Sequence, residues 1–171
     1  MEIVTALPTE LLLVRLSPAD LPQASVFEAL MVNDGMFTFF RHTRPRDMLD
    51  EKTWSAWLVL DTTRKFPDRC IAWGHAQLGE CHKGHTARLG IAVLPEYRGK
   101  GIGTFLVTKL LAETAGREKW IATIFADNPA SLAVFRKHGF IEEGTFVDEE
   151  RWPVKGSRDV ISLAKRRPAE S

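Results

Sequence analysis

The stretch VLPEYRGKGIG, residues 93–103, carries the clearest functional signal in this chain of 171 residues. An apolar strand ends at Pro95, which cannot continue a sheet ladder, and a helix begins near Gly101. The first turn of a helix leaves N–H groups unpaired and carries partial positive charge. Three glycines allow a ligand to approach closely, and Arg98 and Lys100 add positive charge. The stretch therefore predicts a site for a phosphate or diphosphate.

Three other interpretations of this stretch can be compared with a phosphate site. The simplest is a plain strand-to-helix turn with two exposed basic residues, and the other two are known nucleotide-binding motifs. A Walker-type loop needs Gly-x-x-x-x-Gly-Lys-Ser/Thr, which is absent. The dinucleotide fingerprint needs Gly-x-Gly-x-x-Gly directly after a strand. Here the glycines fall at 99, 101 and 103, and residues 95–98 intervene. The spacing disfavours both motifs.

Apolar patterning on either side of the stretch predicts a mixed α/β sheet with helices on its faces. Strands are predicted at 11–16, 54–60, 70–78, 87–94, 120–126, 140–147 and 160–164. Helices are predicted at 18–31, 101–115 and 129–138, and residues 33–50 are irregular or short-helical. The order is β-α-α-β-β-β-α-β-α-β-β, and the length fits a single domain over residues 1–171.

Composition excludes several broad classes of protein. The formal net charge is only +1, so there is no electrostatic case for nucleic acid or a membrane surface. Two cysteines do not make a disulfide framework. The N-terminal residues lack the pattern of a signal peptide, and no apolar run approaches the roughly 20 residues that span a bilayer. We therefore expect a cytoplasmic protein without nucleic-acid or membrane partners.

The chain resembles the GCN5-related N-acetyltransferase family in two motifs. Arg98, Gly101 and Gly103 match the family pattern Arg/Gln-x-x-Gly-x-Gly/Ala. Residues 128–140, NPASLAVFRKHGF, are similar to the family segment Asn-x-x-Ala-x-x-x-Tyr-x-x-x-Gly-Phe. The resemblance covers nearly the whole chain. It implies the acyl-CoA N-acyltransferase fold, in which the fourth and fifth strands splay apart and the cofactor lies in the gap.

The resemblance also implies acetyl-CoA as co-substrate and a set of residues that bind it. The glycine-rich loop would hold the diphosphate through the backbone of Arg98, Gly99, Lys100, Gly101, Ile102 and Gly103, with Thr104 on the same turn. Main-chain groups of Ile91, Ala92 and Val93 would contact the pantetheine arm. Asn128 would also contact the cofactor, although Asn128 before Pro129 is in itself a good helix N-cap. Ser131 would either complete the cap region or contact the cofactor.

The residues that would transfer protons are less clear. The family often has a tyrosine as general acid where this sequence has Phe135. Glutamates that serve other members as general base correspond to Ala87 and Thr123. If the hairpin of residues 70–94 turns near 82 and 83, His75 lies opposite residues 89–91, close to the expected thioester. His75 is therefore our candidate catalytic base, although a histidine held in the sheet by a hydrogen bond is the commoner case. Glu80, His82 and His85 are further candidates near the hairpin.

The acceptor remains open at this level. The resemblance places its pocket between the loop of residues 34–46 and the segment containing Glu149, Glu150 and Trp152. The expected reaction is direct acetyl transfer to a primary amine of a small molecule or of a protein N-terminus or lysine. The alternative is a non-catalytic acyl-CoA-binding or sensing module. Dimers are frequent in the family, so a homodimer fits the resemblance. Cys81, His82 and His85 are too few ligands for a zinc site, and we expect no metal.

Overall fold

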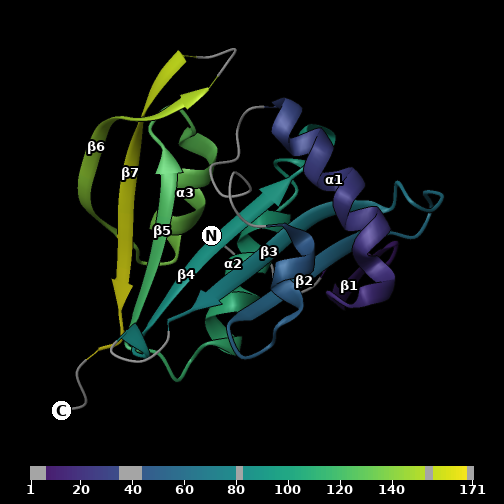
Figure 1. Ribbon diagram of the computed structural model, residues 1–171, viewed down its shortest axis with the longest axis horizontal. Helices are drawn as coiled ribbons and strands as arrows, with labels where there is room; N and C mark the ends of the chain where they lie inside the picture. Colours follow the sequence, from purple (N-terminus) through teal and green to yellow (C-terminus); the bar gives the residue numbers. More distant parts are fainter. Residues whose placement is uncertain (1–6, 35–43, 80–82, 153–155, 169–171) are drawn as a thin grey trace.

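Strand pairing produces a seven-stranded mixed sheet of order β1-β2-β3-β4-β5-β7-β6 (Figure 1). The computed structural model describes residues 7–34, 44–79, 83–152 and 156–168, with only the main chain for 32–34 and 150–152. The strands are β1 (Leu11–Arg15), β2 (Trp54–Asp61), β3 (Cys70–Leu78), β4 (Thr86–Val93), β5 (Lys119–Phe125), β6 (Ile141–Trp152) and β7 (Gly156–Arg166). The helices are α1 (Leu21–Asp34), α2 (Ile102–Glu113) and α3 (Pro129–Lys137). This arrangement confirms the predicted mixed α/β class.

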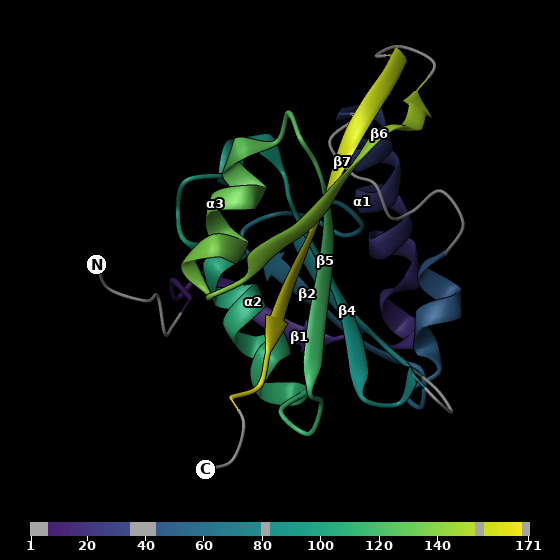
Figure 2. The same ribbon diagram turned by 90° about the vertical axis from the view of Figure 1, so that its left-hand side faces the viewer.

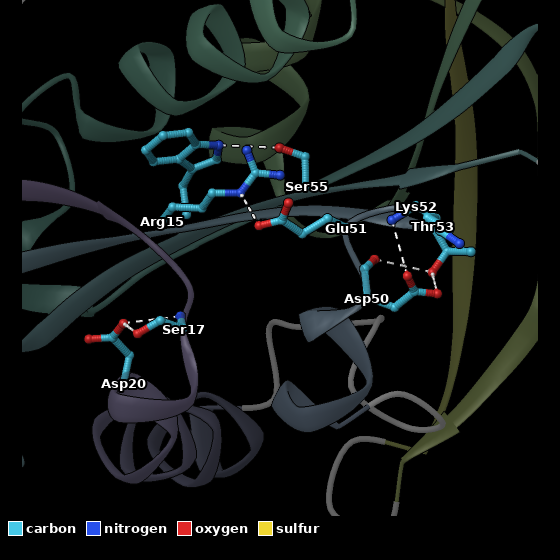
Figure 3. A network of polar contacts seen from close by, with 9 residues as sticks. Arg15, Ser17, Asp20, Asp50, Glu51, Lys52, Thr53 and Ser55 are labelled. Atoms are coloured by element: carbon cyan, nitrogen blue, oxygen red, sulfur yellow. Dashed lines mark hydrogen bonds and ion pairs between the residues drawn. The ribbon is translucent and has the colours of Figure 1, made fainter.

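Short polar side chains set where α1 and β2 begin (Figure 3). Ser17 donates its N–H and its hydroxyl to the Asp20 carboxylate, at 3.1 and 2.5 Å, and a 3₁₀ turn over Pro18–Asp20 leads into α1. Asp50 accepts the Lys52 N–H at 3.1 Å and the Thr53 hydroxyl at 2.9 Å, directly before β2. Such local hydrogen bonds satisfy backbone groups where regular structure starts. Between α1 and β2, Pro45–Leu49 forms a 3₁₀ helix in the segment predicted to be irregular or short-helical.

The helices cover the two faces of the sheet. Figure 2 shows α2 and α3 on one face and α1 on the other. The alternation of β3 side chains explains this, because successive residues point to opposite faces. Trp73 stacks on Phe27 of α1, with ring centroids 6.4 Å apart. A Cβ built on Gly74, the next residue, would instead lie 3.1 Å from Leu106 Cδ2 of α2. Apolar side chains are therefore buried on both faces of the central strands.

The sheet opens between β4 and β5. These parallel strands pair only at Thr86–Lys119, Ala87–Trp120 and Arg88–Ile121. Beyond Arg88 the two strands diverge, which Figure 1 shows as a widening gap between their arrowheads. β5 instead stays paired with β7 along its whole length, from Lys119–Arg166 to Phe125–Val160. The predicted splay of the fourth and fifth strands is thus present.

The last two strands are longer than predicted. β6 continues to Trp152, not 147, and β7 runs over Gly156–Arg166, not 160–164. The added residues are mostly polar, and those of β6 belong to the edge strand, so they lack the apolar pattern used for the prediction. Register shifts within β6 and a positive φ of 54° at Asp148 further interrupt the alternation.

Candidate functional site

A cavity of about 480 Å³ lies where the sheet opens. It is bounded by the end of β4, the turn into α2, the first turns of α3 and one residue of α1, Met31. Because α1 lies on the opposite face from α2 and α3, a cavity that touches all three passes through the gap between β4 and β5. Its lining residues are Met31, Ile91, Ala92, Val93, Tyr97, Arg98, Gly99, Gly101, Ile102, Gly103, Thr104, Asn128, Pro129, Ala130, Ser131, Val134 and Lys137.

The turn from β4 to α2 exposes backbone donors to this cavity. Gly99 and Gly101 have φ angles of 76° and 81°, a left-handed conformation that is strained for residues with side chains. Gly101 is the N-cap of α2 and supplies no side-chain cap. The first hydrogen bond of the helix runs from the Phe105 N–H to the Gly101 carbonyl at 2.9 Å. The N–H groups of residues 102–104 precede that bond, so they are available to an anion.

Strand β4 also turns main-chain groups toward the opening. The N–H of Leu94 donates to the Ile71 carbonyl of β3 at 2.9 Å. Main-chain groups of alternate residues point to opposite edges of a strand, so Ala92 also faces β3, whereas Ile91 and Val93 face the gap. The Val93 carbonyl accepts a hydrogen bond from Arg98 Nε–H at 3.0 Å, which agrees with a carbonyl that points away from β3. Ala92 thus lines the cavity without offering its main-chain groups to it.

Helix α3 forms the far wall. Asn128 is its N-cap, and the side-chain Oδ1 accepts the Ser131 N–H at 3.1 Å. The cap predicted from Asn128-Pro129 is confirmed. Residues 130, 131, 134 and 137 face the cavity, with the spacing of one helical face. This periodicity is a sequence signal by which Val134 and Lys137 could have been found.

The structure gathers all but one of the predicted cofactor residues around the cavity. The exception is Lys100, whose ammonium lies 4.9 Å from the ring centroid of Tyr97 and which does not line the cavity. Lys137 instead brings a positive side chain to the lining. Sequence reasoning also missed Met31 and Tyr97 as lining residues. No local pattern marks Met31, because its position depends on how α1 packs over the sheet.

His75 lies opposite Gly90, as the hairpin prediction required. Its side chain has no exposed surface and does not line the cavity. It packs edge-on against Trp54, with centroids 5.9 Å apart, and occupies the space that a side chain at Gly90 would fill. Burial lowers the pKa of His75 to about 3, which keeps the imidazole neutral and makes it a weak base. Its catalytic role stays a prediction.

The other described positions considered for proton transfer lack a suitable group or, like the exposed His85, do not line the cavity. Phe135 is buried and packs edge-on against Phe140 at 5.1 Å. Ala87 is buried, and Thr123 is exposed and absent from the lining. Tyr97 donates its hydroxyl to Asp61, and this hydrogen bond raises its pKa. Among the described residues, the cavity lining contains no carboxylate and no imidazole.

Much of the expected acceptor region lies outside the described residues. This applies to residues 35–43 and to the side chains of Glu150 and Trp152. Glu80, Cys81 and His82 are also outside them, and elsewhere in the described chain no three His, Cys, Asp or Glu side chains group as metal ligands would. No helix in the described ranges is long and apolar enough to cross a membrane.

The glycines of the turn fit a bulky diphosphate ligand. A Cβ at Gly99 would meet no atom within 4 Å, so the loop is open on that side. A Cβ at Gly103 would lie 3.2 Å from Ile91 Cδ1 and 3.8 Å from Val134 Cγ2, all three being lining residues. A larger residue there would narrow the passage between α2, β4 and α3. The residues present therefore fit an acyl-CoA ligand, whose diphosphate needs free N–H donors such as those at the helix start.

Comparison with known proteins agrees with this geometry. Residues 29–140 match the family described as the acetyltransferase (GNAT) family. The uncharacterized N-acetyltransferase YfmK of Bacillus subtilis (strain 168) is 45% identical over 65 residues, which are 36% of this chain and 43% of YfmK. Across the curated relatives compared, the matched part covers between 28% and 56% of the relative's own length.

Solved structures share the fold. A GNAT-family acetyltransferase from Streptococcus pneumoniae superposes with a TM-score of 0.76, 17% identity and coverage of 92% of this chain and 100% of that one. Spermidine N-acetyltransferase from Vibrio cholerae, in complex with CoA and spermine, superposes with a TM-score of 0.70 and 19% identity. The match covers 93% of this chain and 96% of that one. At these identities the likeness concerns the fold alone. With the family match over most of the chain, the two motifs and the splayed sheet, the chain belongs to the GNAT acetyltransferase family.

Proposed function

We propose that this protein transfers an acetyl group from acetyl-CoA directly to a primary amine. The observation that carries the proposal is the continuity of the cavity, which joins the uncapped start of α2 to the gap between β4 and β5. A diphosphate and a thioester of one ligand can therefore be held at once. Met31 of α1 lines the cavity from the other face of the sheet, and we place the acceptor on that side.

The chain's own groups have distinct roles in this reaction. The N–H groups of residues 102–104 and the positive end of α2 bind the diphosphate. When bound, acetyl-CoA supplies an activated acyl thioester. A main-chain N–H of Ile91 or Val93, which faces the gap, donates a hydrogen bond to the thioester oxygen and stabilises the charge that develops there. The cavity walls hold the two reactants together, which removes much of the entropic barrier.

Proton transfer is assigned to water in this proposal. An attacking amine must lose a proton, yet the described lining offers neither a carboxylate nor an imidazole. The thiolate of coenzyme A is a fair leaving group and does not depend on a side-chain acid. His75→Gln tests the alternative, because a catalytic base at His75 predicts loss of kcat and a changed acid limb of the pH–rate profile. With solvent as base, we expect both to stay near the wild-type values.

The experiment that tests the function is release of free thiol from acetyl-CoA across a panel of amines. The panel includes polyamines, amino acids, aminoglycoside-like amines and peptides with a free N-terminus or lysine. We expect at least one amine to stimulate release and to gain the acetyl group, detected by mass spectrometry. Gly101→Glu provides the inactive-site control. If wild-type protein binds acetyl-CoA and no amine stimulates release, the non-catalytic acyl-CoA-binding module is the better description.

A further inference from the structure

Tyr97, the only tyrosine in the chain, connects the turn before α2 to a distant strand. Its hydroxyl donates to Asp61 Oδ2 at 2.5 Å, across 36 residues of sequence. Asp61 is the last residue of β2 and is only 6% exposed. A short hydrogen bond to a buried carboxylate is stronger than one between neutral groups. The contact is therefore a firm link between the sheet and the turn.

Asp61 is itself held in place from several sides. Its Oδ1 accepts the Thr63 hydroxyl at 2.6 Å and the Thr63 N–H at 2.8 Å, and its own N–H donates to the Arg69 carbonyl at 2.9 Å. Hydrogen bonds from Thr63 and Tyr97 lower the pKa of Asp61, so the carboxylate is charged at neutral pH. The acceptor of the Tyr97 hydroxyl thus has a fixed position and a constant charge.

The segment that follows Tyr97 is rich in glycine. Tyr97 ends the 3₁₀ turn Pro95–Tyr97, and the next residues include the left-handed Gly99 and Gly101. Glycine has the largest backbone freedom to lose, so ordering this segment around a ligand is entropically costly. The Tyr97 ring counters that freedom, because it packs against the core of α1 and β1–β3 and lies 4.9 Å from the Lys100 ammonium.

We propose that Tyr97, anchored by Asp61, is a positioning residue that preorganises the loop of residues 98–104 for the diphosphate of acetyl-CoA. This inference rests on the proposed function. Preorganisation lowers the ordering cost of binding, so its loss weakens affinity without removing any ligand contact. We expect the effect at the diphosphate end, because Tyr97 directly precedes the loop and Asp61 holds its hydroxyl, while the ring, which also lines the cavity, is kept in Tyr97→Phe.

Tyr97→Phe tests the inference, since it removes the hydroxyl and keeps the ring. Dissociation constants are measured for acetyl-CoA by calorimetry and for S-acetyl-pantetheine, which has the thioester arm without the diphosphate, by ligand-observed NMR. We expect the preference for acetyl-CoA over S-acetyl-pantetheine to fall about tenfold, as for loss of one hydrogen bond to a charged group. Asp61→Asn leaves one acceptor oxygen for the hydrogen bonds from Thr63 and Tyr97 and removes the charge, so it should lower the preference in the same direction as Tyr97→Phe.

Glu96→Gln is the matched control. It lies on the same turn and removes the exposed ion pair of Glu96 with Arg64, 3.6 Å apart, which should change the preference less than twofold. Equal weakening toward both ligands in Tyr97→Phe would assign Tyr97 a general structural role and overturn the inference, as would an unchanged preference. Failure of the wild-type protein to bind acetyl-CoA would instead overturn the proposed function.

Discussion

Two strand-to-helix turns lie side by side at the open end of the sheet and differ in how each helix start is satisfied. At the β5–α3 turn, Asn128 caps the helix and accepts the Ser131 N–H at 3.1 Å. At the β4–α2 turn, the N-cap is Gly101, with a φ of 81° and no side-chain cap. A helix that caps itself uses up a donor, whereas an uncapped helix keeps its donors for a ligand. The anion site is therefore expected at α2.

Asn128 nonetheless lines the same cavity. Its Oδ1 is occupied by Ser131, so the amide NH₂ is the end that can donate to a ligand. The two turns thus contribute differently to the cavity. The turn into α2 supplies a group of backbone donors, and the turn into α3 supplies a wall with side-chain donors such as the Asn128 amide.

The largest expected effect is at the uncapped turn. Gly101→Glu places a negative side chain at the start of α2, opposing both the helix dipole and the ligand's charge. We expect the acetyl-CoA dissociation constant, measured by calorimetry, to rise by at least about 100-fold. Gly156→Glu is the control, because Gly156 also has a positive φ, 69°, has no atom within 4 Å of a built Cβ and lies outside the cavity lining. Unchanged affinity in Gly101→Glu would rule out the loop assignment.

A second prediction concerns the strand that leads into the uncapped turn. A Cβ at Gly90 would lie 2.4 Å from His75 Cε1, in a buried site. Gly90→Ala should therefore lower the free energy of unfolding by about 1–3 kcal/mol, measured by denaturant titration. Gly144→Ala in β6, where a Cβ meets no atom within 4 Å, should change it little. If the two variants are equally stable, the imidazole does not occupy the face of Gly90.

Substitutions at the self-capped turn should mainly change the free energy of unfolding. Asn128→Ala removes the cap and should lower the free energy of unfolding by about 1 kcal/mol. Asn128→Asp keeps the acceptor oxygen, so we expect stability near wild type together with weaker acetyl-CoA binding, because a carboxylate replaces the amide donor. Thermal unfolding and calorimetry on the same samples separate the two effects. Full affinity in Asn128→Asp would confine Asn128 to its capping role.

The smallest expected effect is the difference in acetyl-CoA affinity between substitutions of two lysines. Lys137 lines the cavity, whereas Lys100 lies over the Tyr97 ring. Lys137→Ala should raise the acetyl-CoA dissociation constant about threefold at low salt, and Lys100→Ala should raise it less, as for exposed charges. The difference should disappear near 1 M salt, where the screening length is about 3 Å. A larger effect for Lys100 would reverse the assignment.

Features encoded over a few residues were predictable from the sequence. The glycines before α2, the Asn128 cap and the approximate bounds of the central strands follow from backbone sterics and local hydrogen bonds. The position of His75 opposite Gly90 followed from counting along a hairpin. Its burial did not, because burial depends on Trp54 and on the helix that covers that face. A correct register therefore led to a histidine outside the cavity lining.

Contacts between distant segments required the tertiary structure. The Asp61–Tyr97 hydrogen bond joins residues 36 positions apart, and no local sequence pattern around either residue predicts it. Met31 reaches the cavity because of how α1 lies over the sheet, and β6 extends to Trp152 although its polar residues lack strand alternation. Such pairings are selected by the energy of the whole packed arrangement and have no fixed spacing in sequence.

The sequence alone determined that a strand ends shortly before Pro95 and that an uncapped, glycine-rich helix start follows, because these properties depend on φ, ψ and unpaired N–H groups of adjacent residues. Tertiary structure decided what surrounds that helix start. β5 pairs with β7 and leaves β4 after three residue pairs, which opens the gap that turns a phosphate-binding turn into a continuous cavity. Pairing of strands far apart in the chain is a long-range choice, and for that reason the site became visible only in the folded protein.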